Sequence, residues 1–348
     1  MISTYLKKHI LACGLGFALC YSSIGQAQES INCDTDSFET VQKDILNAKK
    51  KTQTASQKRF IRRKPLLSSS QLRQPHAEFR LITNQGDVTF QDQFGQDKLP
   101  MNGDGSSNLM DGDRIRTGAQ SFVTLQTKDG TFLTISSHSD LLLSNIKKSP
   151  VQLELAQGNV ESLVTKQKAT ERKSNYQIKT PVVTLSVRGT RFKVMHSKNS
   201  GNTNVSVEDG LVAAQLRQEC GRAVLLGEGN GAVASSNRIQ VTDMLSIPAD
   251  IDLSPVEKTK GLAVSSKPVS DAVLYHAQAS LDESALLVVK EVYGTSPELI
   301  LEGLENGYYF VRFSAIDANG VEGFSDVRTV LYQPPPNSNL WLEDFIKP

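Results

Sequence analysis

The chain has few cysteines and few histidines, and neither kind is spaced as a metal site requires. Four cysteines and five histidines are spread over 348 residues, with no His-Glu-x-x-His motif and no closely spaced Cys and His pairs. A phosphate-cradling glycine loop and a Gly-x-Ser-x-Gly nucleophile motif are also missing. The sequence therefore predicts no catalytic residues, no metal site and no cofactor, so we expect a protein that is not an enzyme.

Long apolar runs are missing after residue 27, whereas the N-terminus contains one. Lys7 and Lys8 precede an apolar stretch at 10–24, and Gly25-Gln26-Ala27 places small residues at the −3 and −1 positions of a cleavage site. This is the layout of a secretory signal peptide, and an uncleaved anchor is the alternative. We expect cleavage after Ala27, a periplasmic location, and no membrane span after cleavage.

An excess of charge of one sign is missing as well. Of the 38 basic side chains, Lys7 and Lys8 leave with the signal peptide, so 36 face 37 acidic ones. This balance gives no drive toward nucleic acid, and we predict no nucleic-acid partner. The stretch 49–73 carries nine positive charges and no acidic residue. We interpret it as a solvated linker, and contact with an anionic glycan or with lipid head groups is the alternative.

Two cysteines remain after the expected cleavage, Cys33 and Cys220. An even pair in an oxidising compartment predicts a disulfide. It would tie the mature N-terminus to the end of the central module, and two free buried thiols are the alternative. Between these cysteines, Asp34 or Asp36 can cap a short N-terminal helix.

From about Phe79 the pattern changes to short runs typical of β-strands. Val151, Leu153 and Leu155 alternate with polar residues, as in a strand with one buried face. Asp-Gly at 129–130 and at 209–210 falls between two such runs each, and this dipeptide is a strong hairpin signal. Many short strands separated by tight turns predict an all-β fold: a sandwich, a barrel or stacked hairpins.

A series of motifs in this region resembles the FecR domain over about residues 85–217. The motifs are Gly-Asp-Arg-Ile-Arg-Thr-Gly (112–118), Asp-Gly (129–130), Thr-Pro (180–181), Val-Arg-Gly-Thr-Arg-Phe (187–192) and Val-Glu-Asp-Gly (207–210). In the namesake proteins the domain is periplasmic and belongs to an inner-membrane sigma-factor regulator. That regulator receives a signal from an outer-membrane TonB-dependent transducer. This chain has a signal peptide where the regulators have a sigma-binding segment and a membrane span, so we do not expect direct control of a sigma factor.

The motif residues also have direct physical interpretations. Turns or close backbone approach explain the structural motif residues Gly112, Asp113, Gly118, Gly130, Pro181, Gly189 and Gly210. Four arginines flank these turns: Arg114, Arg116, Arg188 and Arg191. They bond turn carbonyls or pair with nearby acids in one interpretation. In the other they form a partner-binding site for a carboxylate or an acidic partner.

A second β-rich region follows from about Ser254 to residue 333. The stretch Leu304–Gly320 resembles the end of a fibronectin type III or related immunoglobulin-like domain. Leu304, Gly307 and Tyr309 are similar to the corner in which a buried tyrosine hydroxyl returns to the backbone before the penultimate strand. The tail after Pro334 contains apolar residues that either dock on a partner or fold back.

These observations predict five parts: a signal peptide (1–27), a helical and basic linker (28–78), a FecR-like β domain (79–245), an immunoglobulin-like β-sandwich (254–333) and a C-terminal tail (334–348). The predicted function is that of a non-catalytic envelope scaffold or sensor accessory. It would recognise another envelope protein through strand edges and turn-borne arginines. The alternative is a module that binds peptidoglycan or another polysaccharide of the cell envelope.

Overall fold

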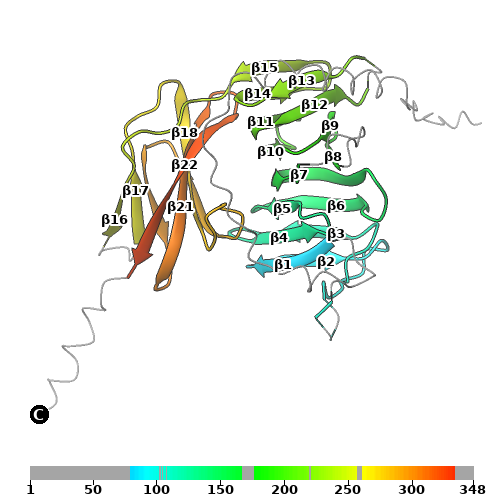
Figure 1. Ribbon diagram of the computed structural model, residues 1–348, viewed down its shortest axis with the longest axis horizontal. Coiled ribbons are helices and arrows are strands. Elements are labelled where there is room, and N and C mark those ends of the chain that lie inside the picture. The colour runs from blue at the N-terminus through cyan, green and yellow to red at the C-terminus, as the bar shows by residue number, and fades with distance from the viewer. Residues whose placement is uncertain are drawn as a thin grey trace, which may run out of the picture. The chain divides into compact units, whose positions relative to one another are not determined.

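Every regular element in the described part of the chain is a β-strand, as Figure 1 shows, so the all-β prediction is confirmed. The computed structural model describes residues 79–101, 103, 105–106, 108–166, 176–218, 221–256 and 261–333. Outside these ranges lie the predicted signal peptide, the short helix, the basic stretch 49–73, both Cys33 and Cys220, and the tail 334–348. No helix in the described ranges is long and apolar enough to span a membrane.

The first fifteen strands form two layers of one continuous hydrogen-bonded sheet, which share strand β7 (Val151–Leu163). Sheet A contains β1 (Phe79–Gln85), β4 (Phe122–Thr127), β5 (Phe132–Ile135), the end of β7, β10 (Arg191–His196), β11 (Thr203–Asp209), β14 (Asn230–Ala234) and β15 (Ile239–Asp243). Sheet B contains β2 (Val88–Gln91), β3 (Arg114–Thr117), β6 (Asp140–Asn145), the start of β7, β8 (Tyr176–Lys179), β9 (Val183–Val187), β12 (Leu211–Leu216) and β13 (Val224–Gly227).

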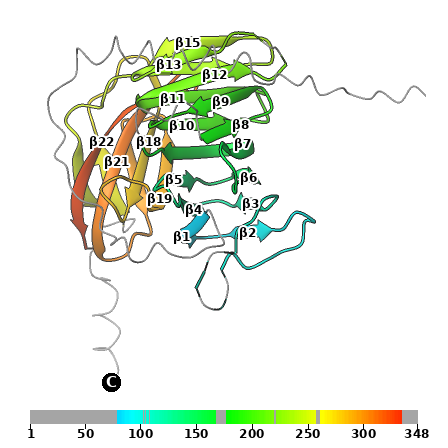
Figure 2. The same ribbon diagram turned by 45° about the vertical axis from the view of Figure 1, so that its right-hand side comes forward.

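Successive hairpins alternate between these two sheets for most of the chain. β2–β3 and β6–β7 lie in sheet B with β4–β5 between them in sheet A. After the hairpin β8–β9 in sheet B, the pairs β10–β11, β12–β13 and β14–β15 alternate again. Figure 2 shows the stacked strands that result. Of the three predicted possibilities, stacked hairpins describe this arrangement.

Glycines occupy the corners at which the chain passes from one sheet to the other. β7 pairs with β6 in sheet B up to Gln157 and with β10 in sheet A from Gly158 onward. Gly158 has a φ of +96°, and a Cβ there would overlap Ser139. Only glycine combines this conformation with so close an approach to a neighbouring chain segment.

The two Asp-Gly signals have different outcomes. Asp129-Gly130 is a hairpin turn between β4 and β5, as predicted, with the Gly130 amide donating to the Thr127 carbonyl at 3.0 Å. The hairpin prediction for Asp209-Gly210 is wrong, because β11 lies in sheet A and β12 in sheet B and the two do not pair. Gly210 has a positive φ of +93° and lies where the chain passes from sheet A to sheet B. The tolerance of Asp-Gly for positive φ is therefore used here in a connection between two sheets and not in a hairpin.

The core between sheets A and B comes from the alternation that the sequence shows. Val160 on β7, Phe192 on β10 and Val205 on β11 are buried, as are Leu153 and Leu185 on the sheet B side. Residues next to them along each strand point away from this core. Each sheet therefore has an inner apolar face and an outer face that is largely polar.

The remaining strands form a β-sandwich, which we call the C-terminal sandwich. Its three-stranded sheet has the order β16 (Asp252–Val256), β17 (Gly261–Ser265) and β20 (Glu298–Glu302). Its four-stranded sheet has the order β19 (Val288–Gly294), β18 (Ala272–Ser280), β21 (Gly307–Asp317) and β22 (Glu322–Tyr332). Tyr309 Oη donates to the Glu305 carbonyl at 3.1 Å, which is the tyrosine corner expected there. Membership of the fibronectin type III family stays a prediction.

We predict that Gly210→Ala destabilises the fold by at least about 2 kcal/mol, because it adds backbone strain and a clash. A Cβ at Gly210 would lie 2.6 Å from the Gly189 carbonyl oxygen. Gly201→Ala is the matched control: φ there is +70°, but no atom lies within 4 Å of the added carbon. It should cost only about 1 kcal/mol. Urea unfolding of both variants measures the difference, and equal losses would contradict the role of the corner.

Candidate functional site

The outer face of sheet A is polar in sequence but buried in the structure. Thr124 on β4, Thr134 on β5, Glu161 on β7 and Lys193 on β10 all point away from the core between the sheets. Their exposed fractions are nevertheless only 0%, 2%, 5% and 6%. Thr124 Oγ1 and Thr134 Oγ1 both donate to the Leu286 carbonyl at 2.8 Å, just before β19. The C-terminal sandwich therefore covers this face.

The covering surface belongs to the four-stranded sheet of the sandwich and is also polar. On β21, Val311 and Phe313 pack inside the sandwich, whereas Arg312 between them points outward. On β18, Ala277 packs inside and His276 points outward. The two assemblies thus meet through polar faces, and burial of such faces requires that their charges be paired.

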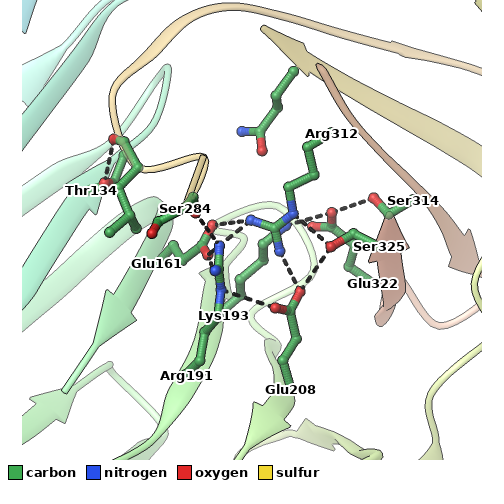
Figure 3. A network of polar contacts seen from close by, with 12 residues as sticks. Thr134, Glu161, Arg191, Lys193, Glu208, Ser284, Arg312, Ser314, Glu322 and Ser325 are labelled. Atoms are coloured by element: carbon green, nitrogen blue, oxygen red, sulfur yellow. Dashed lines mark hydrogen bonds and ion pairs between the residues drawn. The ribbon is translucent and has the colours of Figure 1, made fainter. Parts of the chain in front are cut away.

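Arg312 is the centre of the contact, as Figure 3 shows. Its Nη1 donates to Glu161 Oε2 at 2.7 Å and to Oε1 at 2.8 Å. Its Nη2 bonds to Glu208 of β11, and its Nε donates to Ser325 Oγ of β22 at 2.8 Å. The guanidinium is only 1% exposed. A planar cation with several donors in fixed directions can satisfy two carboxylates at once in this way.

Arg191 closes the cluster from sheet A. Its Nη2 lies 2.6 Å from Glu161 Oε1, and its Nε lies 3.0 Å from Glu208 Oε2. The same Nη2 donates to the Ser284 carbonyl of the sandwich at 2.7 Å. Two carboxylates of sheet A are therefore held between one arginine of their own sheet and Arg312 of the sandwich.

A second group of charges lies around Glu322 of β22. Lys193 Nζ donates to Glu322 Oε1 at 2.6 Å, and Ser314 Oγ donates to the same oxygen at 2.5 Å. His276 Nδ1 lies 3.1 Å from that oxygen, and His276 Nε2 lies 3.4 Å from Glu291 Oε2. Lys193 comes from sheet A and the other four residues from the sandwich, so this group also bridges the contact. We call both groups together the buried ionic cluster.

The carboxyl groups of the cluster are strongly perturbed. Burial would raise the pKa of Glu161, but the charges of Arg312, Arg191 and Lys193 outweigh it and lower the pKa to about 2. For Glu322 burial again opposes ionisation, and Lys193 and His276 hold its pKa well below the usual range. Burial would lower the pKa of Arg312, yet Glu161 and Glu208 raise it. All three groups are therefore ionised at neutral pH.

Two glutamine side chains, Gln85 on β1 and Gln120 in the turn before β4, hydrogen-bond to the outer edge of β19. Gln120 Nε2 donates to the Glu291 carbonyl at 2.7 Å, and Gln120 Oε1 accepts from the Glu291 amide at 3.2 Å. Gln85 Nε2 donates to the Val289 carbonyl at 3.0 Å. These bonds satisfy backbone groups of β19 that would otherwise be free to pair with a further strand.

The structure brings two of the four predicted partner-binding arginines together, Arg114 and Arg116 at Asp140, and places Arg188 and Arg191 elsewhere. Arg114 makes two bonds to Asp140, of 2.5 and 2.9 Å, and Arg116 bonds to Gln91 at 2.6 Å and contacts Asp140. Arg191 belongs to the buried ionic cluster, and Arg188 lies in the corner between β9 and β10. Whether any of them also contacts a partner stays a prediction.

The predicted structural motif residues lie in turns and corners. Asp113 Oδ2 accepts from Lys98 Nζ at 2.7 Å and from the Met110 amide at 2.8 Å. Gly112 and Gly189 have positive φ angles, and the Gly118 amide donates to the Asp87 carbonyl at 2.8 Å. Pro181 stands in the turn between β8 and β9.

Most of the buried ionic cluster was missed at the level of sequence. Glu161, Lys193, His276, Arg312 and Glu322 received no role there. A signal was present: Arg312 interrupts the apolar run Tyr-Tyr-Phe-Val-Arg-Phe-Ser-Ala-Ile at 308–316. A lone charge in such a strand indicates a polar contact on its outer face. In the described ranges no group of three or more His, Cys, Asp or Glu side chains forms a candidate metal site.

We predict that Arg312→Ala costs about 3–5 kcal/mol of stability, because it leaves Glu161 and Glu208 buried beside too little positive charge. Arg328→Ala is the matched control on the next strand, since Arg328 is 53% exposed and pairs with Asp326. That change should stay within about 1 kcal/mol. Thermal unfolding of both variants measures the difference, and similar small losses would show that the buried pairing is unimportant.

The lowered pKa of Glu161 also predicts acid sensitivity. A carboxyl group whose folded pKa is about 2, below its ordinary 4.5, adds stability that is present above about pH 4.5. That stability is lost as the pH falls toward 2. Glu161→Gln should therefore reduce the slope of stability against pH between those values. Denaturant unfolding at a series of pH values tests this, and an unchanged slope would contradict it.

The FecR protein family matches residues 113–213, a range that includes all four predicted arginines. Comparison with curated proteins finds no significant match. Two crystal structures of a proposed anti-sigma factor from Parabacteroides distasonis ATCC 8503, at 1.65 and 2.50 Å resolution, are similar to part of the chain. The sequence identities are 16% and 14%, and the TM-score is 0.32 for both.

The similarity covers 37% of this chain and 59% of each neighbour, so less than two thirds of the neighbours' length is spanned. At this TM-score it is too weak to assign a function. The family match covers less than a third of the chain. It runs from Asp113, just before β3, into β12 and includes the series of FecR-like motifs found in the sequence. Residues 113–213 of this chain are a FecR domain.

Proposed function

We propose that this chain is an exported, non-catalytic envelope protein that recognises another envelope protein and acts as a scaffold or sensor accessory. The FecR domain and the signal-peptide layout support the class and the periplasmic location. We also propose the boundaries 79–245 and 254–333 for its two β domains. The gap between β15, which ends at Asp243, and β16, which begins at Asp252, supports them.

The observation that carries the proposal is the edge of β15, which pairs with β14 on one side and, within the described ranges, with no strand on the other. In its hairpin with β14, the Ser235 amide donates to the Arg238 carbonyl and the Met244 amide donates to the Gly229 carbonyl, both at 2.9 Å. Antiparallel pairing alternates by residue, so Gln240 and Thr242 face β14. The backbone groups of Ile239, Val241 and Asp243 consequently point out of the sheet.

This edge lacks the protection that other edges of the molecule have. The edge of β19 is bonded to Gln85 and Gln120, and the edge of β2 is bridged where the Lys98 amide donates to the Phe90 carbonyl at 2.9 Å. The edge strand β16 contains Pro255. β15 has no proline, no lysine and no register shift against β14. An extended segment of another protein can therefore add to sheet A at this edge.

A polysaccharide-binding role is the second candidate, and the outer face of sheet B favours it. Hydrogen-bonded polar side chains cross several strands there: Gln152 Nε2 donates to Gln177 Oε1 at 3.1 Å, and Lys179 Nζ donates to Gln152 Oε1 at 3.2 Å. Such amides also suit sugar hydroxyls. In the described strands of sheet B the aromatic side chains are those of Phe90 and Tyr176, and both are buried in the core, so we rank protein recognition first.

We predict that Val241→Pro weakens partner capture about tenfold or more, because it removes an outward amide and blocks a strand-to-strand hydrogen bond. The bonds to β14 are kept, so the melting temperature should be nearly unchanged. Val241→Thr is the matched control, since it keeps the amide and the branched shape. The measurement is photo-crosslinking from position 239 in intact cells, followed by mass spectrometry.

An envelope protein captured by the wild-type chain and by Val241→Thr, and lost from Val241→Pro, would support the proposal. Equal capture by the proline variant would place the interface elsewhere. Recovery of cell-wall fragments alone would favour the polysaccharide-binding alternative.

A further inference from the structure

His276 occupies a buried position at the contact between sheet A and the C-terminal sandwich. It is 1% exposed, and its ring stacks on Tyr293 with the centroids 4.0 Å apart. Both ring nitrogens face carboxylates: Nδ1 is 3.1 Å from Glu322 Oε1, and Nε2 is 3.4 Å from Glu291 Oε2. The second contact is an ion pair rather than a well-aligned hydrogen bond.

This geometry selects one protonation state of the ring. An ionised carboxylate can only accept hydrogen bonds, and a neutral imidazole has one nitrogen that donates and one that accepts. Neutral His276 would therefore point a lone pair at either Glu322 or Glu291. The imidazolium donates from Nδ1 to Glu322 and places its positive charge beside Glu291, so it meets both carboxylates favourably.

A charge count of the buried ionic cluster leads to the same state. Sheet A contributes two carboxylates and two cations, namely Glu161, Glu208, Arg191 and Lys193. The sandwich contributes Glu291 and Glu322 against Arg312 alone, unless His276 is charged. With His276 protonated, four positive charges face four negative ones. Without that proton one uncompensated negative charge stays buried, which is costly.

The groups that face His276 come from every strand packed around it. Glu322 lies on β22, Glu291 and Tyr293 lie on β19, and Lys193 lies on β10. On β21 the residue opposite His276 is the uncharged Ser314, which donates to Glu322. Burial would lower the pKa of His276, and so would Lys193, but Glu322 and Glu291 outweigh both and raise it. The two carboxylates thus favour the protonated form of His276 more than burial and Lys193 oppose it.

We propose that His276 is a proton-operated latch, which holds the C-terminal sandwich on the outer face of sheet A while it is protonated and releases that face when it is not. Its folded-state pKa lies above the ordinary 6.5. The stabilisation is therefore complete below about pH 6.5 and is lost as the pH rises through the folded value. Release would expose a polar face that carries Glu161 and Lys193, which the docked sandwich now covers.

The test follows docking in the full mature chain as a function of pH. Hydrogen exchange of the segment 284–293, corrected for the intrinsic rate, is the readout, because Glu291 bonds to Gln120 and Val289 bonds to Gln85 across the contact. Loss of one proton changes the docking constant by at most tenfold per pH unit. We expect exchange in the wild-type chain to rise toward this limit above the folded pKa of His276.

Two variants and one control make the outcome decisive. His276→Gln should remove this pH dependence, whereas His138→Gln, at an exposed corner, should keep it. Glu291→Gln removes one of the two facing carboxylates and should move the midpoint to lower pH by about one unit or more. A purely structural role for His276 would not move the midpoint.

The latch is wrong if docking of the wild-type chain does not change between pH 5.5 and 9. It is also wrong if His276→Gln keeps the wild-type pH dependence, or if Glu291→Gln leaves the midpoint in place. None of these three results depends on whether β15 binds a partner, so the proposed function and the latch fail independently.

Discussion

The pairing of Arg312 with Glu161 is the interaction on which the relation between the two β assemblies depends. Both side chains are almost fully buried, and they lie 151 positions apart in the chain. Each would be costly in an apolar interior without the other. Glu208 and Arg191 complete the coordination from sheet A, and Ser325 completes it from the sandwich. The contact therefore depends on the register of the two sheets, because a shift of one against the other would separate these paired charges.

This kind of contact differs from an apolar one in its response to conditions. Apolar burial is nearly indifferent to pH, whereas an ionic interface changes with every proton that its members gain or lose. Glu161 and Glu322 favour docking above their lowered pKa values, and His276 favours it below its raised one. The contact is therefore strongest in a pH range whose lower limit is set by Glu161 and Glu322 and whose upper limit is set by His276.

The strands and their inner faces could be predicted from the sequence, because alternation reports which side chains enter a core. Val151, Leu153 and Leu155 and the hairpin at Asp129-Gly130 are examples. The connection at Asp209-Gly210 could not be predicted in the same way. A hairpin and a corner between sheets both need a residue with positive φ, so the local signal is the same for the two. Which one forms depends on where the next strand finds its partner, and that is a long-range property.

The sequence by itself determined that this chain is built of short strands, that its FecR motifs fall at turns, and that Tyr309 forms a corner near the end of the sandwich. Only the tertiary structure decided what the outer faces do. Alternation marks Glu161, Lys193 and Arg312 as pointing away from their own cores, and a polar outer face ordinarily meets water. The structure instead places two such faces against each other. The cause is charge complementarity between strands far apart in the chain, which no local pattern records.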